Sequence, residues 1–107
     1  MLLVFKALAD ESRQRLVAVL AQGDFNVNEL IEILRMGQSR ISRHLKILAD
    51  CGIVTNRREG NWIYYALAPV PEQPDLAELV RIAVQCVKAT KGYEKDLQHL
   101  ESLVQRR

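Results

Sequence analysis

The segment from Gln38 to Ala49 has two chemically different faces when it is written as an α-helix. Residues three and four positions apart share a helix face. The apolar face consists of Ile41, Leu45 and Leu48, with His44 at its margin. The opposite face carries small hydroxyls and long cations, namely Ser39, Ser42, Arg43 and Lys46. Such a helix must pack on a core by one side, and its cationic side suits the major groove of DNA. A merely solvated surface would have the same composition.

The positive charge of the chain is concentrated in its middle third. The whole chain has 107 residues and a net charge of only +2 at neutral pH. Residues 35–66, however, contain six Lys and Arg against two Asp and Glu, whereas residues 1–34 carry a net negative charge. A chain of this length forms one domain with one modest core. The charge distribution therefore places a candidate phosphate-binding surface in the middle of a single domain.

Three shorter helical segments are predicted before this amphipathic helix. Residues 2–8 are apolar at helical spacing, and Asp10 is a good N-cap for a second helix that Gly23 ends. The sequence Asn26-Val27-Asn28-Glu29 has the pattern of a capping box for a third helix. Met36-Gly37 then forms a tight turn. Two short helices joined by so small a turn form a helix-turn-helix.

The sequence changes to a two-residue period after Gly52, where the amphipathic helix ends. Residues 53–58 and 61–67 are rich in β-branched and aromatic residues and flank a turn, which predicts a β-hairpin. Arg57 and Arg58 lie beside that turn. A hairpin with a basic tip directly after a DNA-facing helix is a wing, which contacts the phosphate backbone or the minor groove. An edge hairpin with solvated arginines is the alternative, and the shared sign of charge weighs against it.

Residues 75–107 carry more apolar surface than a small domain of this kind can cover. Pro69, Pro71 and Pro74 mark a linker, and Asp75 is placed to cap the following helix. The first tail helix has a broad apolar stripe of Leu76, Leu79, Val80, Ala83, Val84 and Val87. After Thr90-Lys91-Gly92 a second stripe follows, made of Leu97, Leu100, Leu103 and Val104. We expect a second copy of the chain to cover this surface together with Leu3 and Val4 of the first helix. A tail that folds back on its own domain is the alternative.

These patterns predict a mostly α-helical α+β fold, a winged helix-turn-helix, in one domain over residues 1–107. Residues 1–9 and 75–107 are its predicted helical dimerisation elements. No run is apolar enough to span a membrane and no signal peptide opens the chain, so we expect a cytoplasmic protein. The sequence contains no glycine-rich nucleotide loop, nucleophile–base pair or paired carboxylates, so we expect no enzyme activity.

Three stretches, FKALADESRQRL, VNELIEILRMGQSRISRHLKILADCGIV and RREGNWIYYAL, resemble the bacterial ArsR/SmtB family of dimeric winged-helix repressors over residues 5–67. The resemblance implies a homodimer that presents one recognition helix to each half of an inverted repeat and that an effector releases from DNA. The base-reading positions of the family fall on Gln38, Ser39, Ser42 and Arg43. Its backbone contacts fall on Lys46, Arg57 and Arg58, and its minor-groove approach falls near Asn61, while Arg40 completes the candidate set. His44 matches a frequent family residue, for which we expect core packing or a backbone hydrogen bond.

The chain departs from the family's metal-sensing members at both of their best-known sites. Where arsenic- and cadmium-sensing members have Cys-Val-Cys, this chain has Asn26-Val27-Asn28, without the thiolates that a soft metal needs. The tail has His99 but lacks the Asp and His pairs of zinc- and cobalt-type members, and we expect His99 to be solvated. We therefore predict no metal site, no cofactor and an effector of unknown identity.

The two cysteines leave another interpretation open, a repressor switched by thiol chemistry at Cys51 and Cys86. Redox sensors of the family pair a cysteine near the second helix with one in the last helix, and only Cys86 matches. We expect both residues to be small buried hydrophobes instead. A protein–protein interaction module on the same scaffold is the alternative from a different functional class. The run from Asn26 to Asp50 also resembles the regulatory front segment of longer proteins that continue into a methyltransferase domain.

Overall fold

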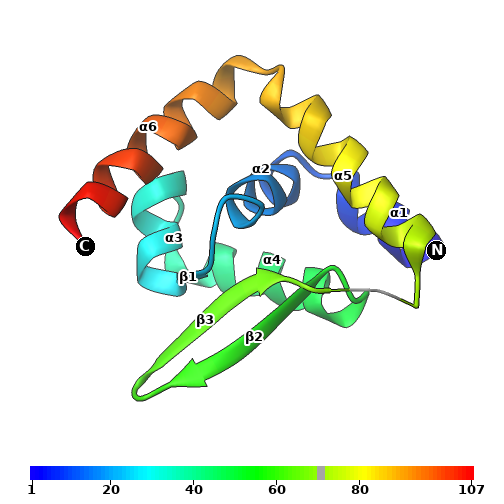
Figure 1. Ribbon diagram of the computed structural model, residues 1–107, viewed down its shortest axis with the longest axis horizontal. Helices are drawn as coiled ribbons and strands as arrows, with labels where there is room; N and C mark the ends of the chain where they lie inside the picture. The colour runs from blue at the N-terminus through cyan, green and yellow to red at the C-terminus, as the bar shows by residue number, and fades with distance from the viewer. Residues whose placement is uncertain (70–71) are drawn as a thin grey trace.

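Helix α2 (Glu11–Leu20) is the central element of the computed structural model, which describes residues 1–69 and 72–107. It contacts α1, α3, α4, α5 and α6 as well as strand β3. The other elements surround it as Figure 1 shows. Their bounds in chain order are α1 (Leu2–Leu8), β1 (Phe25–Asn26), α3 (Val27–Leu34), α4 (Gln38–Asp50), β2 (Val54–Glu59), β3 (Trp62–Leu67), α5 (Pro74–Lys88) and α6 (Lys91–Arg106).

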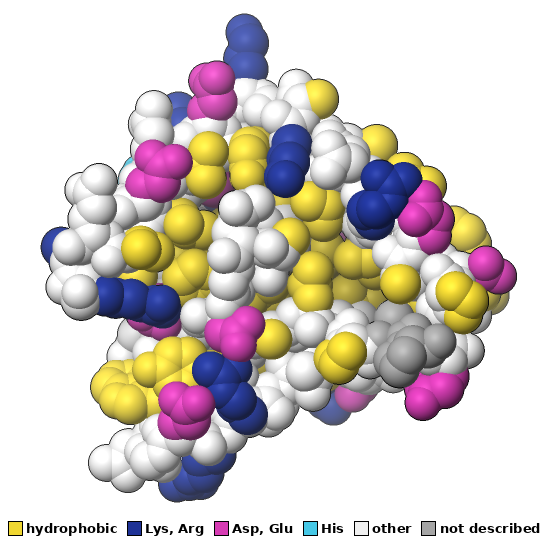
Figure 2. Space-filling model, in the orientation of Figure 1, with side chains coloured by type: hydrophobic (Ala, Val, Ile, Leu, Met, Phe, Trp, Pro, Cys, Tyr) yellow, Lys and Arg dark blue, Asp and Glu magenta, His cyan; other side chains and the backbone are white. Residues whose placement is uncertain are grey.

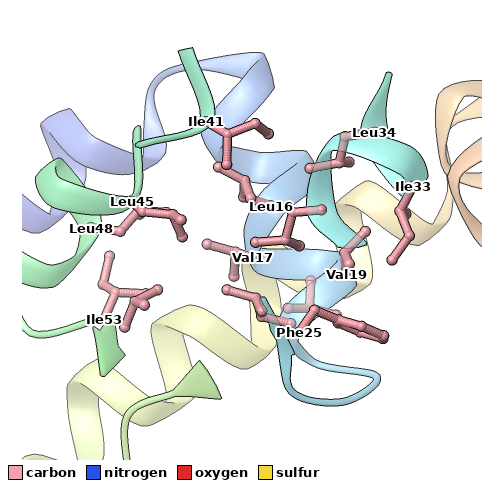
Figure 3. Packing of buried hydrophobic residues seen from close by; sticks show 14 of the residues in the cluster. Leu16, Val17, Val19, Phe25, Ile33, Leu34, Ile41, Leu45, Leu48 and Ile53 are labelled. Carbon is pink, nitrogen blue, oxygen red and sulfur yellow. The ribbon is translucent and has the colours of Figure 1, made fainter. Parts of the chain in front are cut away.

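The second half of α2 is buried on all sides, which is why the rest of the molecule can pack around it. Residues 16–20 are each no more than 3% exposed. Figure 3 shows Leu16 and Val17 lying between side chains of α4, such as Ile41 and Leu45, and side chains of α3, such as Leu34. Burying one such aliphatic side chain contributes about 1.5–3 kcal/mol to folding. The core therefore fixes the position of α4 relative to α3.

The helix-turn-helix consists of α3 and α4 and forms as predicted. Asn26 and Glu29 make both hydrogen bonds of the capping box, at 2.8 and 3.0 Å. Arg35 ends α3 in a left-handed conformation (φ 58°), which costs a non-glycine residue about 1–3 kcal/mol and is held here by the packing of α3 and α4 on either side of the turn. Gly52 ends α4 with a φ of 85°, which glycine adopts without strain.

The predicted hairpin is part of a three-stranded antiparallel sheet with the strand order β1-β3-β2. Val54 pairs with Leu67 at its base and Glu59 with Trp62 at its tip. The two-residue strand β1 pairs with β3 through Phe25 and Tyr65 and was absent from the prediction. A strand of two residues has no period of its own, so only the tertiary pairing with β3 reveals it.

Helices α5 and α6 form an arch over α2 (Figure 1). Helix α5 packs on α2, and α6 packs on α3 and α2. Leu100 and Leu103 of α6 are 8% and 6% exposed, so α6 follows the alternative in which the tail folds back on its own domain. Asp75 does not cap α5, because Gln73 is the N-cap residue and Asp75 lies inside the first turn. The predicted linker residue Pro71 lies outside the described residues.

Three of the seven residues expected at a subunit interface lie in the core of the single chain instead. Val4, Leu76 and Val87 are 5%, 3% and 6% exposed, because these side chains of α1 and α5 face other helices of the same chain. Leu79, Val80 and Ala83 are half-buried against that core. Leu3 is 67% exposed and Leu2 beside it is equally exposed. The part of the expected interface that remains a large exposed apolar surface is therefore on α1.

No helix in residues 1–69 and 72–107 combines the length and the apolar composition that crossing a lipid bilayer requires.

Candidate nucleic-acid interface

The outer face of α4 is exposed and carries the predicted DNA-binding side chains. Gln38, Ser39, Ser42, Arg43 and Lys46 are all exposed, as is Arg40, which lies at the edge of this face next to α2. Ile41, Leu45 and Leu48 on the opposite face are at most 1% exposed. The core thereby holds the backbone of α4 rigidly while its polar face points outward. A rigid helix with a free polar and cationic face is the geometry that major-groove recognition requires.

Arg43 is the cation of α4 that has the fewest contacts with other charged or polar side chains. In the part of the chain that the structure describes, its guanidinium makes no ion pair or side-chain hydrogen bond. Lys46 pairs with Asp50 one turn later, with 3.3 Å between Nζ and Oδ2, and both side chains are well exposed. Exposed pairs of this kind are worth about 0–1 kcal/mol, so Lys46 can exchange Asp50 for a phosphate at little cost.

Arg40 is directed away from the outer face of α4. Its Nη2 donates a hydrogen bond of 2.7 Å to the hydroxyl of Ser12, which is 7% exposed in the first turn of α2. This contact ties the start of α4 to α2 and uses one of the five guanidinium donors. Arg40 thus positions the helix, and its remaining donors are available to a ligand beside it.

His44 is a structural residue that joins α4 to the junction between α1 and α2. It is 6% exposed, and its Nδ1 lies 3.2 Å from Nη1 of Arg13. Because a guanidinium only donates, Nδ1 is the acceptor and the imidazole is neutral. Burial lowers the pKa of His44 below 6.5, the nearby Asp10 opposes this shift, and Arg13, Arg43 and Arg40 reinforce it. Core packing is thus confirmed, but the hydrogen-bond partner is a side chain rather than the backbone.

The basic tip of the hairpin holds its two arginines differently. Arg57 pairs with Glu59 at 2.9 Å and with Asp24, and its guanidinium lies 5.3 Å from the ring centre of Tyr64. Arg58 donates to the carbonyl of Gly60 at 3.1 Å, and no ion pair of the described residues involves it. Arg58 therefore offers a free charge at the tip, whereas Arg57 must exchange carboxylates for phosphate before it can contact DNA.

Two apolar side chains at the tip were missed as candidate contacts. Trp62 and Ile63 are 49% and 42% exposed, next to the exposed Asn61. Successive side chains of a strand point to opposite faces, so one of the two would be expected to pack on the helices. Both are exposed because the tip of the hairpin extends beyond the helices, as Figure 1 shows. Apolar side chains placed beside a minor groove can pack on sugars or between bases.

The cysteines and His99 differ from the sequence-based expectations. Cys51 is half-buried and donates to the carbonyl of Leu48 at 3.5 Å, while Cys86 is exposed on α5 and is therefore no buried hydrophobe. His99 is half-buried, and its Nδ1 lies 2.9 Å from the carbonyl oxygen of Ile33, so it is bound to α3 rather than solvated. Across residues 1–69 and 72–107, no three His, Cys, Asp or Glu side chains cluster as a metal site would require.

Comparison with known proteins identifies the family. Residues 10–56 match the family described as bacterial regulatory protein, arsR family. The arsenic resistance transcriptional regulators ArsR1 and ArsR2 of Pseudomonas putida are 45% and 40% identical over 75 and 84 residues. These matches cover 68% and 77% of this chain but 59% and 71% of the relatives, so the chain spans about three fifths of the length of the first relative.

A solved structure agrees with the family match. The homodimeric winged helix-turn-helix DNA-binding domain of a possible ArsR-family transcriptional regulator from Mycobacterium bovis is 35% identical. It superposes with a TM-score of 0.67 over 80% of this chain and 75% of that domain. The winged helix-turn-helix prediction is thereby confirmed, and the family is one of DNA-binding regulators rather than enzymes. The chain belongs to the ArsR family of bacterial regulatory proteins.

Proposed function

We propose that this protein is a homodimeric transcriptional repressor that binds an inverted-repeat operator and leaves it when an effector binds. The exposed face of α4, with Arg43 free of protein partners among the described residues, is the observation that carries the proposal. Gln38, Ser39, Ser42 and Arg43 read base edges, with Arg43 bidentate to a guanine. Lys46 and Arg58 contact phosphates, Arg57 joins them after releasing its carboxylates, and Asn61 approaches the minor groove.

The relatives and the exposed surface of α1 support the other parts of this proposal. Several relatives are named repressors, including the arsenical resistance operon repressors of Escherichia coli and Bacillus subtilis. The neighbouring M. bovis domain is homodimeric. In this chain Leu2, Leu3 and Phe5 are 67%, 67% and 53% exposed, a surface that a second subunit would cover. Two recognition helices about 34 Å apart would then meet successive major grooves.

The effector differs from a soft metal bound at the start of α3. Asn26 occupies that place, and its side chain already accepts from the backbone of Glu29. The Oε1 atom of Glu29 accepts from the backbone amide of Asn26, and its Oε2 atom accepts from Arg107 at 2.6 Å. The start of α3 is thus a satisfied hydrogen-bonding network with amide and carboxylate groups rather than thiolates, and it offers a soft metal no suitable ligand.

Selection of bound sequences from a random DNA pool, followed by titration at two salt concentrations, tests the proposal. We expect an inverted repeat to be enriched and its affinity to fall steeply as salt rises. The Arg43→Ala/Lys46→Ala variant should lose this binding. The Lys91→Ala/Lys95→Ala variant has the same change of charge on α6, far from α4, and should keep it.

Failure to enrich any sequence with a folded dimer would contradict the proposal and favour the protein–protein interaction module. Enrichment of a site without dyad symmetry would contradict the dimeric arrangement alone. If oxidation releases the protein from DNA, and the Cys51→Ser/Cys86→Ser variant is no longer released, a thiol switch would replace the proposed effector.

A further inference from the structure

An open groove lies between α5 and the base of the hairpin, on the side of α2 opposite to α3. Its volume is about 420 Å³, which lies in the range of small-molecule sites. The apolar side chains Ile53, Leu67, Val80 and Val84 line its floor. In Figure 2 apolar side chains are gathered in the hollow below the arch of α5 and α6.

The charged residues along this groove are all basic. Arg81 and Lys88, two turns apart on α5, are the charged residues among those that line it. Arg81 is paired with Glu78 on its own helix, with 2.9 Å between Nε and Oε2. Lys88 is exposed and makes no ion pair within the described residues. An apolar floor with an unpaired cation at its edge complements a molecule that has an apolar body and one anionic group.

The groove stays open if a second subunit covers the remaining apolar surface. Ala77, Arg81 and Lys88 share one side of α5 because they are spaced by about one and two turns. Ile82, which is 46% exposed, and the exposed Cys86 lie on the other side of the helix. A partner that packs against the Ile82 side of α5 therefore leaves the groove free.

The floor of the groove includes the junction between the recognition helix and the wing. The amide of Ile53 donates to the carbonyl of Leu48 in α4 at 3.0 Å, and the carbonyl of Ile53 accepts from Ala68 after β3 at 2.9 Å. Gly52 and Ile53 both line the groove. A molecule lying there touches the residue that sets how the hairpin leaves α4, and it also touches α5.

We propose that this groove binds a small apolar carboxylate as the effector, with the hydrocarbon on Ile53, Leu67 and Val84 and the anionic group at Lys88. This assignment deepens the proposed repressor function and rests on it for the effect on DNA. The binding itself does not depend on DNA, so the two can fail separately.

Calorimetric titration of the full chain with hexanoate, octanoate and decanoate tests the binding. We expect one site per subunit, with affinity rising about fourfold for each added methylene that is buried. Decanol and decylammonium should bind at least fivefold more weakly than decanoate, because neither brings an anion to Lys88. Equal binding of all three head groups would overturn the proposal.

Three variants locate the site. Lys88→Gln should weaken decanoate at least fivefold, whereas the matched change Lys95→Gln on α6 should leave it unchanged. Ala77→Trp places a large side chain at the exposed edge of the groove and should abolish binding while the protein stays folded. Unchanged binding in both Lys88→Gln and Ala77→Trp would overturn the assignment, as would dissociation of a dimer in step with decanoate binding.

The effect on DNA is measured last, with the sequence selected in the absence of decanoate. We expect saturating decanoate to lower the affinity of the wild type at least tenfold and to leave Ala77→Trp unaffected. Binding of decanoate without any change in DNA affinity would overturn its role as effector. If the protein does not bind DNA even without decanoate, that result would contradict the proposed function instead.

Discussion

The guanidinium of Arg15 on α2 donates two hydrogen bonds to the carboxylate of Asp96 on α6, at 2.9 and 2.8 Å. The Nη2 atom of Arg15, which makes the shorter of these two bonds, also donates to the carbonyl of Leu34 at the end of α3, at 2.9 Å. The carboxylate is 3% exposed and the guanidinium side chain 26% exposed. This pair therefore joins three helices through a charge that water barely reaches, and Asp96 raises the pKa of Arg15.

Replacing Arg15 by leucine should destabilise the fold by about 3–5 kcal/mol, because it leaves the buried carboxylate of Asp96 without a partner. Asp96→Leu in the same chain should restore most of that loss, because no unpaired charge remains. Denaturant unfolding of the single and double variants measures both values. A single variant as stable as the wild type would show that water reaches the carboxylate.

Arg43→Ala should weaken binding to the selected DNA site by about 1–3 kcal/mol and relax the preference at one base pair. Lys46→Ala should weaken all sequences about equally and reduce the slope of log affinity against log salt by about one. Binding titrations on the selected site and on single-base variants distinguish these patterns. Equal loss on every sequence for Arg43→Ala would reassign it to a phosphate.

The free energy of unfolding should fall as the pH drops below about 6.5, because His44 is neutral in the folded protein. Burial lowers the pKa of His44 in the folded state, so the unfolded chain takes up a proton first and the stabilisation present above pH 6.5 is lost. In His44→Gln the amide oxygen can still accept from Arg13 but does not titrate. Between pH 7.5 and pH 5.5 the wild type should lose more unfolding free energy than this variant. Parallel losses would contradict the assignment.

Asn26→Ala should destabilise the protein by about 1 kcal/mol, because the side chain satisfies the backbone amide of Glu29 at the start of α3. Asn28→Ala is the matched control, because Asn28 is exposed in the same helical turn and caps nothing. Thermal or denaturant unfolding compares the two variants. An equal change in both would mean that the capping box does not contribute to stability.

Leu3→Glu should dissociate the proposed dimer, because it puts a charge into the exposed apolar surface of α1. Val104→Glu on α6 makes the same kind of change at a side chain that is 45% exposed and should leave the dimer intact. Sedimentation velocity over a range of concentrations measures the outcome. A Leu3→Glu protein that remains dimeric would move the interface away from α1.

Much of the local structure could be predicted because it depends on neighbours in the chain. The capping box of Asn26 and Glu29 and the two faces of α4 involve residues three or four positions apart, and the structure has both. The hairpin follows from alternation around one turn, and its observed strands differ from the predicted bounds by one residue at three of their four ends. The exposed face of α4 was visible for the same reason, since the apolar residues of that helix left it no other side to bury.

The tertiary structure decided what depends on residues distant in the sequence. Only the fold reveals that Arg40 contacts Ser12, that Arg57 is held by Asp24, and that His44 accepts from Arg13. Likewise, whether an apolar stripe faces its own core or a second subunit depends on how helices pack. Val4, Leu76 and Val87 lie in the core although their pattern is the same as that of an interface. Periodicity shows that a helix has an apolar side, but the identity of the surface that covers it is a property of the whole molecule.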